Sequence, residues 1–197
     1  DSTGDWSSDV CSSDLLFAAL VKGLTSSISD SGGRDVNIVN ASLIAKQKGI
    51  VINESHRRES SSLTYASLVT LRTSTSDGTG EQTISGYVSG NSIYISKLDR
   101  FTTSFVPEGT LIICHNYDSP GMIGHVGGIL GSRDINIKFM SVAALDGPGN
   151  TAPIQDISGK VQKEALMILG VDGVVGKDNI AELVAQEGIL DVSVVRI

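Results

Sequence analysis

The sequence is short of positive charge and of long apolar runs, and each shortage excludes a class of protein. Its 15 Lys and Arg residues face 22 Asp and Glu residues, which gives a formal net charge of −7 over 197 residues. Non-specific nucleic-acid binding needs a basic surface that displaces counterions from phosphates, so we expect no nucleic-acid partner. A helix needs roughly 20 apolar residues to cross a bilayer. No run of that length and no basic amphipathic stretch occurs, so we expect no membrane partner.

Cysteine and histidine are also scarce, which argues against disulfides and metals. The two cysteines, Cys11 and Cys114, cannot form a disulfide framework. The three histidines are scattered, and none has a second ligand at the spacing of a zinc site, so we expect no bound metal. The apolar run 15–21 follows acidic residues, unlike the basic start of a signal peptide. We therefore expect a cytoplasmic protein with reduced thiols.

Residues 1–15 differ in character from the rest of the chain. They contain four aspartates and no lysine or arginine. Read back into codons, 5–15 resembles one frame of a sequencing-library adapter. We interpret 1–15 as a non-native tail, leave it out of the fold prediction, and expect the natural chain to continue upstream with other residues.

The next segment carries a helical pattern. Apolar residues recur at helical spacing over 16–28 and again over 36–48. Gly49 follows the second run, where a glycine is a typical helix stop. We predict two helices.

Alternation of period two then predicts strands. The predicted strands are 50–52, 63–72, 82–88 and 92–96. Asp77-Gly78 indicates a turn, and Gly90-Asn91 is typical of a two-residue hairpin loop. Residues 16–107 are thus predicted to form an α+β domain with an antiparallel sheet, which ends where Pro107 and Gly109 interrupt the strand pattern.

Residues 108–197 show a regular rhythm. Strand, helix, strand, strand, helix and strand are predicted over 110–115, 120–132, 135–142, 165–171, 177–187 and 189–197. This order is the ferredoxin-like βαββαβ unit. Its helices cover one face of the sheet, which leaves the other face or an edge for a partner. The intervening 146–163 is predicted to be a long loop.

The first helix of this unit has an apolar side. Pro120 suits the first helical position. Ile123, Val126 and Leu130, with Ile129, recur at helical spacing and are predicted to face the sheet.

The residues 116–124 join the first strand of this unit to its first helix. Free N–H groups at a helix N-terminus favour an anion such as a carboxylate, and the Asp118 carboxylate can accept a hydrogen bond from an ammonium group. Together they could hold both ends of an amino acid. From the residues alone, the alternative that Asp118 simply caps the helix is favoured. Gly124 belongs to a run of five glycines that suggests close backbone approach to a ligand or a partner helix.

The turn D-x-P-G-x-I-G at 118–124 and Asn136 within Ile135-Asn136-Ile137 resemble an ACT domain, a ferredoxin-like amino-acid-sensing domain. The resemblance implies that Asp118, Asn136 and, less directly, Asn116 contact a small amino acid. It also implies a homo-oligomer, with the turn of one subunit and the Asn of another sharing the effector.

The first part of the chain resembles the intervening domain of long D-3-phosphoglycerate dehydrogenases at residues 36–41, 45–50, 86–90 and 106–109. The sequence at 115–118 and 137–140 resembles fungal members of this family. The resemblance covers 16–197 and implies an intervening domain over 16–107 and an ACT domain over 108–197. Some family members bind an anion on the intervening domain. Arg57, Arg58, Lys97 and Arg100 are candidates for such a patch, although basic residues are more often solvated surface.

No catalytic residue is predicted. Hydride transfer needs a dinucleotide-binding fold of about 150 residues and an acid–base pair, and neither is visible. The resemblance implies a regulatory fragment that binds L-serine or another small amino acid for feedback control, with NAD bound in an upstream domain of the parent enzyme. The alternatives are the β chain of an iron–sulfur L-serine dehydratase and a free-standing amino-acid-binding module.

Overall fold

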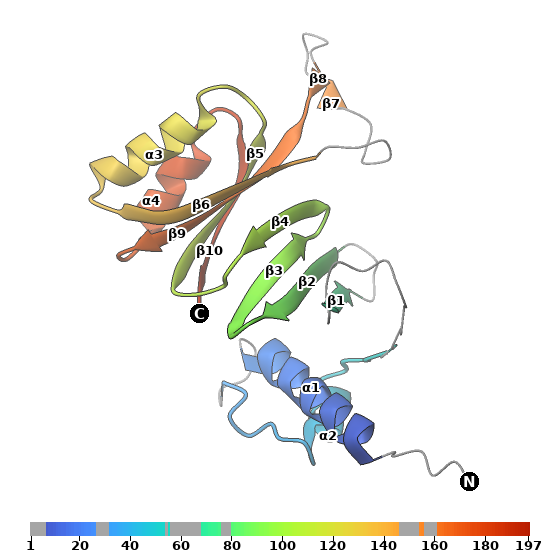
Figure 1. Cartoon of the computed structure of the whole chain (residues 1–197). Helices are drawn as coiled ribbons and strands as arrows, with labels where there is room; N and C mark the ends of the chain where they lie inside the picture. Colours follow the sequence, from blue (N-terminus) through green and yellow to red (C-terminus); the bar gives the residue numbers. More distant parts are fainter. Residues whose placement is uncertain are drawn as a thin grey trace. The chain divides into compact units, whose positions relative to one another are not determined.

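The computed structural model describes residues 7–26, 32–53, 55, 68–75, 80–145, 154–155 and 161–197, with the backbone alone at 7–14, 154–155 and 161–162. The chain divides into two compact units, Asp1–Ser60 and Ser61–Ile197 (Figure 1). The described part is α+β, as predicted, with four helices and two four-stranded antiparallel sheets.

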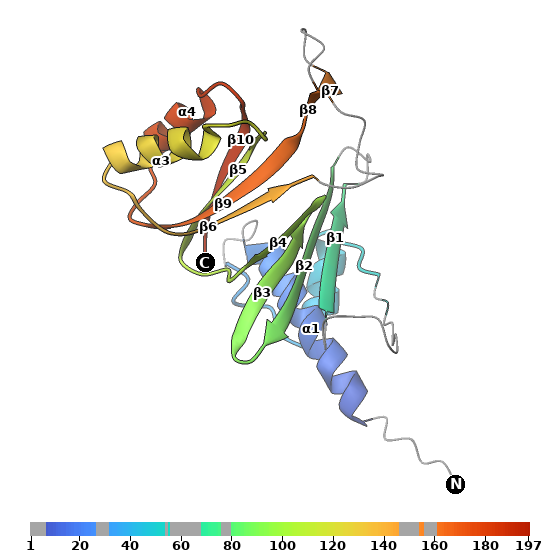
Figure 2. The ribbon, with the colours of Figure 1, turned by 45° about the horizontal axis from the view of Figure 1, so that its top comes forward.

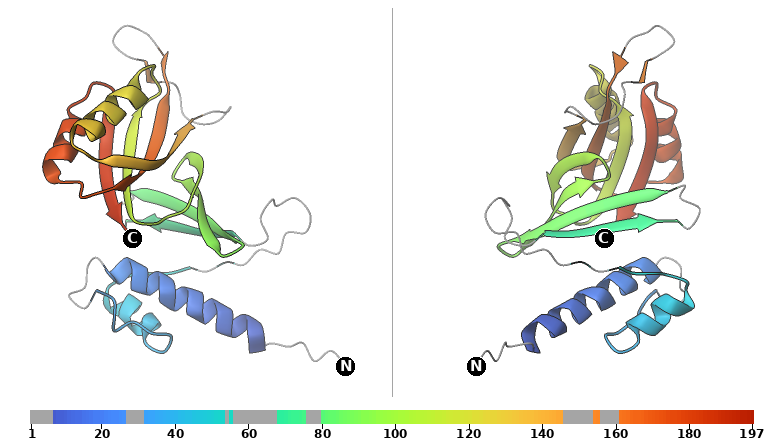
Figure 3. Two further views of the ribbon diagram at one scale, coloured as in Figure 1. Left: turned by 60° about the vertical axis from the view of Figure 1, so that its left-hand side comes forward. Right: turned by 90° about the vertical axis from the view of Figure 1, so that its right-hand side faces the viewer.

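The described part of the first unit contains two helices, α1 (Ser7–Ser26) and α2 (Ala41–Gln47), which lie side by side (Figure 3). A small apolar cluster joins them, built from Ala18, Val21, Val36, Ala41 and Ala45.

The second helix is shorter than the predicted 36–48. Oδ1 of Asn37 accepts the N–H groups of Val39 at 2.9 Å and Asn40 at 3.1 Å, and such a side-chain turn competes with helix formation. Gly49 ends the helical turn with a φ of 70°. The predicted strand 50–52 is wrong, because this segment pairs with no strand in the described structure and packs Ile50 and Ile52 on the helices instead.

The described part of the second unit begins with a meander of four strands (Figure 2). The strands are β1 (Leu68–Ser74), β2 (Glu81–Ser89), β3 (Ser92–Leu98) and β4 (Phe101–Phe105), in the order β1-β2-β3-β4. The predicted hairpin at Gly90 is confirmed, since Ser89 pairs with Ser92 across a glycine with φ of 59°. The predicted turn at 77–78 and residues 63–67 lie outside the described residues.

The short strand β4 was not predicted. It follows a tight turn in which Asp99 adopts a left-handed φ of 50°. Oδ1 of Asp99 accepts the Thr83 N–H at 2.7 Å, which fastens the turn to β2. An aspartate tolerates this conformation because its side chain can bond locally.

The second sheet has the predicted ferredoxin-like topology. Its strands are β5 (Thr110–Tyr117), β6 (Asn136–Ala144), β9 (Glu164–Asp172) and β10 (Ile189–Arg196), in the order β10-β5-β9-β6. Helices α3 (Met122–Ser132) and α4 (Lys177–Val184) cover one face (Figure 2). A two-residue ladder of β7 (Ile154–Gln155) and β8 (Val161–Gln162) lies within the segment predicted as loop.

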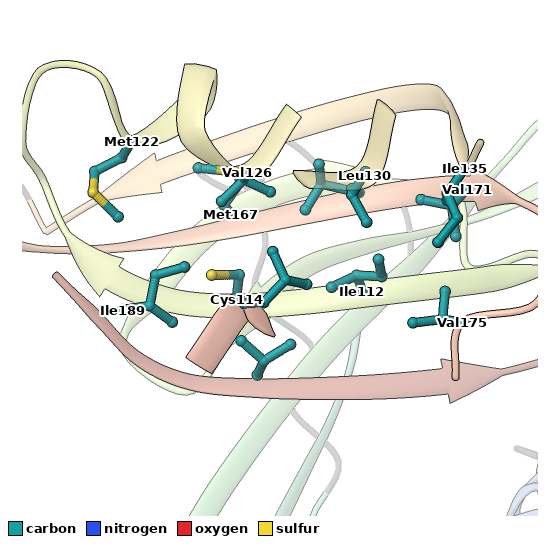
Figure 4. Close-up of a cluster of buried hydrophobic side chains, with 13 residues drawn as sticks. Ile112, Cys114, Met122, Val126, Leu130, Ile135, Met167, Val171, Val175 and Ile189 are labelled. Carbon is teal, nitrogen blue, oxygen red and sulfur yellow. The ribbon is translucent and has the colours of Figure 1, made fainter. Parts of the chain in front are cut away.

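The main core fills the space between α3, α4 and this sheet. Figure 4 shows Val126 and Leu130 of α3 pointing toward the strand that carries Ile112 and Cys114. The full cluster is Ile112, Cys114, Met122, Val126, Leu130, Ile135, Met167, Leu169, Val171, Val175, Leu183, Ile189 and Val192.

The start and the first inward residue of α3 were predicted wrongly. Gly121, with φ of 93°, is the N-cap, so Pro120 precedes the helix and does not begin it. Met122 is consequently buried, whereas Ile123 is 51% exposed. Val126 and Leu130 face the sheet as predicted.

The other face of this sheet is partly covered by the chain itself. Phe101 and Phe105 of β4 are buried in a second cluster. Its members from the sheet are Leu111, Ala143, Leu166 and Ile168. The face that the sequence left open for a partner is therefore occupied in part by the first sheet of the same unit.

Candidate effector site at the turn between β5 and α3

The turn between β5 and α3 is held in place by backbone hydrogen bonds. The Asp118 N–H donates to the Lys163 carbonyl at 2.7 Å, and the Tyr117 N–H donates to the Gly188 carbonyl at 2.8 Å. Gly121 is required at its φ of 93°, a conformation that other residues rarely adopt. The turn is thus fixed to the residues that directly precede β9 and β10.

Asp118 is exposed at this turn and does not cap the helix. The N-cap is Gly121, and within the described residues α3 has no side-chain cap hydrogen bond. The first turn of an α-helix leaves N–H groups without intrahelical partners. The capping alternative therefore fails, and a carboxylate stands beside a positively polarised helix end.

Asn116, two residues earlier, is buried with one group unsatisfied. It is 2% exposed, and its Nδ2 donates to the Tyr117 carbonyl at 2.7 Å. Among the described side chains, its Oδ1 is buried and has no hydrogen-bond partner. Turning the amide over would set oxygen against the Tyr117 carbonyl. An unpaired buried acceptor costs roughly 1–3 kcal/mol, so this atom calls for a donor.

Asn136 lies at the far end of the sheet from Asp118. It begins β6 and pairs with Asp172, whereas Ala144, at the other end of β6, is in register with Ala165, the partner of Asn116. Eight residue steps separate Asn136 from Ala144, about 26 Å at the rise of a strand. One chain does not bring Asn136 to the turn.

Gly124 is exposed in the first turn of α3. A Cβ built there would meet no atom within 4 Å. Packing inside this chain therefore does not require glycine at this position.

Only two of the four residues of the predicted anion patch, Lys97 and Arg100, are described by the structure. Arg57 and Arg58 lie outside the described residues. Lys97 is exposed on β3, and Arg100 donates to Glu164 at 2.5 Å. Arg100 is thus already engaged by a carboxylate.

Glu164 is a residue near the turn that the sequence did not single out. Its Oε2 is also 2.9 Å from Nε2 of His115. Glu164 is separated from Arg100 and His115 by 64 and 49 residues. No local pattern could have indicated this cluster.

Across the described ranges, no group of three or more His, Cys, Asp or Glu residues could hold a metal ion. No helix in the same part of the chain is both long and apolar enough to span a bilayer.

The first part of the chain matches a known protein family. The family described as the D-3-phosphoglycerate dehydrogenase intervening domain matches residues 8–94. With the ferredoxin-like unit that follows, this defines a two-part regulatory region.

Three D-3-phosphoglycerate dehydrogenases match most of this chain. The chain is 36% identical over 168 residues to D-3-phosphoglycerate dehydrogenase 2, chloroplastic, of Arabidopsis thaliana, covering 80% of this chain and 24% of the relative. It is 33% identical over 184 residues to D-3-phosphoglycerate dehydrogenase of Methanocaldococcus jannaschii (93% and 31%) and 30% identical over 158 residues to that of Bacillus subtilis (80% and 26%). The chain belongs to the D-3-phosphoglycerate dehydrogenase family, as its regulatory region, and spans a quarter to a third of these relatives.

These relatives come from a plant, an archaeon and a bacterium, so they give no support to the predicted likeness to fungal members. The family match begins at residue 8 and α1 at Ser7, both inside the segment interpreted as a tail. That interpretation, like the boundary at 107–108, stays a prediction.

Proposed function

We propose that this chain is the effector-sensing part of an NAD-dependent D-3-phosphoglycerate dehydrogenase, and that L-serine is its effector. The relatives' name supports the parent activity, and NAD would bind in a part of the parent enzyme outside this chain. The observation that carries the sensor proposal is Asp118, exposed beside the N-terminus of α3 without capping it.

The site offers a group for each part of an amino acid. The Asp118 carboxylate would accept hydrogen bonds from the ammonium group, and the N–H groups at the start of α3 would donate to the carboxylate. The unsatisfied Oδ1 of Asn116 lies two residues away on β5 and would accept a further donor. Gly124 would leave room for close approach on the helix.

The site would be shared between two subunits. Asn136 is about 26 Å from the end of β5 that carries the turn. Two chains packed antiparallel along β6 and α3 would bring Asn136 of one to the turn of the other. We therefore propose a homo-oligomer through this domain.

The alternatives drawn from the sequence are not favoured. The relatives described above are dehydrogenases, and their match covers most of this chain. This supports neither an L-serine dehydratase β chain nor a free-standing module. The anion patch and the cytoplasmic location stay predictions.

The test is calorimetric titration of the whole chain with L-serine, with glycine and L-alanine as controls. We expect saturable serine binding that Asp118→Ala abolishes. Asp178→Ala is the matched control, since Asp178 is an exposed aspartate in the first turn of α4. Absence of heat at millimolar serine would refute the sensor proposal, and unchanged affinity in Asp118→Ala would refute the site.

A further inference from the structure

Besides the apolar contacts of β4, the carboxylate of Glu164 links the two sheets of the second unit. Oε2 of Glu164 accepts hydrogen bonds from Nη2 of Arg100 at 2.5 Å and from Nε2 of His115 at 2.9 Å. The Glu164 side chain is only 11% exposed. An ionised carboxylate accepts and never donates, so the His115 Nε2 carries a hydrogen in this contact.

On one side, the cluster is attached to the first sheet. The Asp99 N–H donates to the Thr83 carbonyl at 2.6 Å, and the Thr83 N–H donates to Oδ1 of Asp99 at 2.7 Å. Arg100 follows directly and lies over the Phe101 ring, with 5.9 Å from guanidinium to centroid. Phe101 meets the His115 ring edge-on at 5.5 Å. Arg100 therefore moves with the turn between β3 and β4.

On the other side, the cluster is attached to the turn that carries Asp118. Lys163, the residue before Glu164, accepts the Asp118 N–H at 2.7 Å. Glu164 itself is in register with Tyr117. His115 directly precedes Asn116 on β5. One peptide unit thus separates the Glu164 cluster from the backbone bond that holds Asp118.

We propose that Glu164 is a positioning residue that couples the turn between β5 and α3 to the turn between β3 and β4. A nearly buried carboxylate that loses one of its partners is strongly disfavoured. A ligand that fixes the Asp118 turn therefore also restrains Arg100 and β4. The coupling is reciprocal, so a change in the first sheet alters affinity at the turn. This inference rests on the proposed amino-acid site.

The test is hydrogen exchange of the whole chain with and without L-serine. In the wild type, we expect serine to slow exchange both at 116–122 and at 99–105. In Glu164→Gln, which keeps the shape and removes the charge, protection at 116–122 should remain. Protection at 99–105 should fall at least twofold. Arg100→Gln should give the same result, and the double variant should be no worse than either single one.

Glu182→Gln is the matched control, because it removes the exposed Arg133–Glu182 pair (2.7 Å) elsewhere in the same unit. It should leave both protected regions unchanged. Serine protection at 116–122 alone in the wild type would overturn the coupling and leave the effector site standing. Protection at 99–105 that survives in both the Glu164 and Arg100 variants would overturn it as well. No serine protection anywhere would overturn the effector site, and the coupling with it.

Discussion

Cys114 lies fully buried in the core between the helices and the second sheet. Its burial, with a smaller contribution from the charge of Asp191, raises the pKa of the thiol to about 11. The thiolate is the reactive form of cysteine. We expect iodoacetamide to leave Cys114 unlabelled in the native protein at pH 8 and to label it in urea, as mass spectrometry of a Cys11→Ser variant would show. Rapid native labelling would contradict the burial.

The same thiol predicts a loss of stability in alkali. The pKa of Cys114 is raised from 9.0 to about 11 in the folded state, so the unfolded chain ionises first. The contribution of the neutral, buried thiol to the free energy of unfolding is fully present below pH 9. It is lost as the pH rises through 11. Each pKa unit corresponds to about 1.36 kcal/mol, so the loss is roughly 3 kcal/mol. Urea unfolding between pH 8 and 11 should show the free energy of unfolding falling with pH, and the Cys114→Ala variant should lack this fall.

Adding a side chain at Gly170 should lower the stability of the fold, whereas adding one at an exposed glycine of α3 should raise it. A Cβ at Gly170 would lie 2.1 Å from the Phe139 ring, which also stacks on Phe105. Gly170→Ala should destabilise by about 1–3 kcal/mol in urea unfolding, since overpacking displaces neighbours. Gly128→Ala on α3, where a Cβ meets nothing within this chain, should stabilise the isolated chain in dilute protein by up to about 1 kcal/mol. Equal changes in stability in the two variants would contradict the close packing of Gly170 against Phe139.

Single residues could be predicted where the signal is local. The strand over 110–115 was predicted, and Asp118 could be placed before a helix. The Glu164 cluster and the contact between Gly170 and Phe139 could not, because strand pairing and the packing of the two sheets, not sequence spacing, bring their partners together.

At the scale of elements, substitutions in α3 test which side of this helix is buried. Leu130 is fully buried and Ile123 is 51% exposed on the same helix. Leu130→Ala should destabilise the chain by about 2–5 kcal/mol, as loss of a buried side chain leaves a cavity. Ile123→Ala should change stability by less than about 1 kcal/mol in the same urea titration. A large loss from Ile123→Ala in dilute protein would contradict its exposure.

Elements were predicted well where periodicity runs long and less well at their ends. The helical pattern of 120–132 was correct, but the backbone of Gly121 delays the start and so buries Met122 in place of Ile123. Asn37 shortens α2 in a similar way. β4 was missed because its five residues carry too little pattern, and its position depends on packing against the second sheet.

At the scale of the molecule, the order of the elements was enough to predict the ferredoxin-like unit, because the split βαβ arrangement allows few topologies. The cover that β4 gives the second face of the sheet was not predictable, since it depends on a contact between segments far apart in the chain. The proposed sharing of the effector site follows from topology in the same way: β5 and β6 run parallel, so Asp118 follows the end of one and Asn136 begins the other.

This geometry predicts complementation between two defective variants. Asp118→Ala and Asn136→Ala should each abolish serine binding as homodimers, since every site would lack one group. In a heterodimer of the two, one site combines both defects and the other is intact. A 1:1 mixture, unfolded and refolded together, should contain about half heterodimers and therefore recover about a quarter of the wild-type sites in calorimetry. If both groups instead served a site within one subunit, mixing would restore no binding, and the shared site would be refuted.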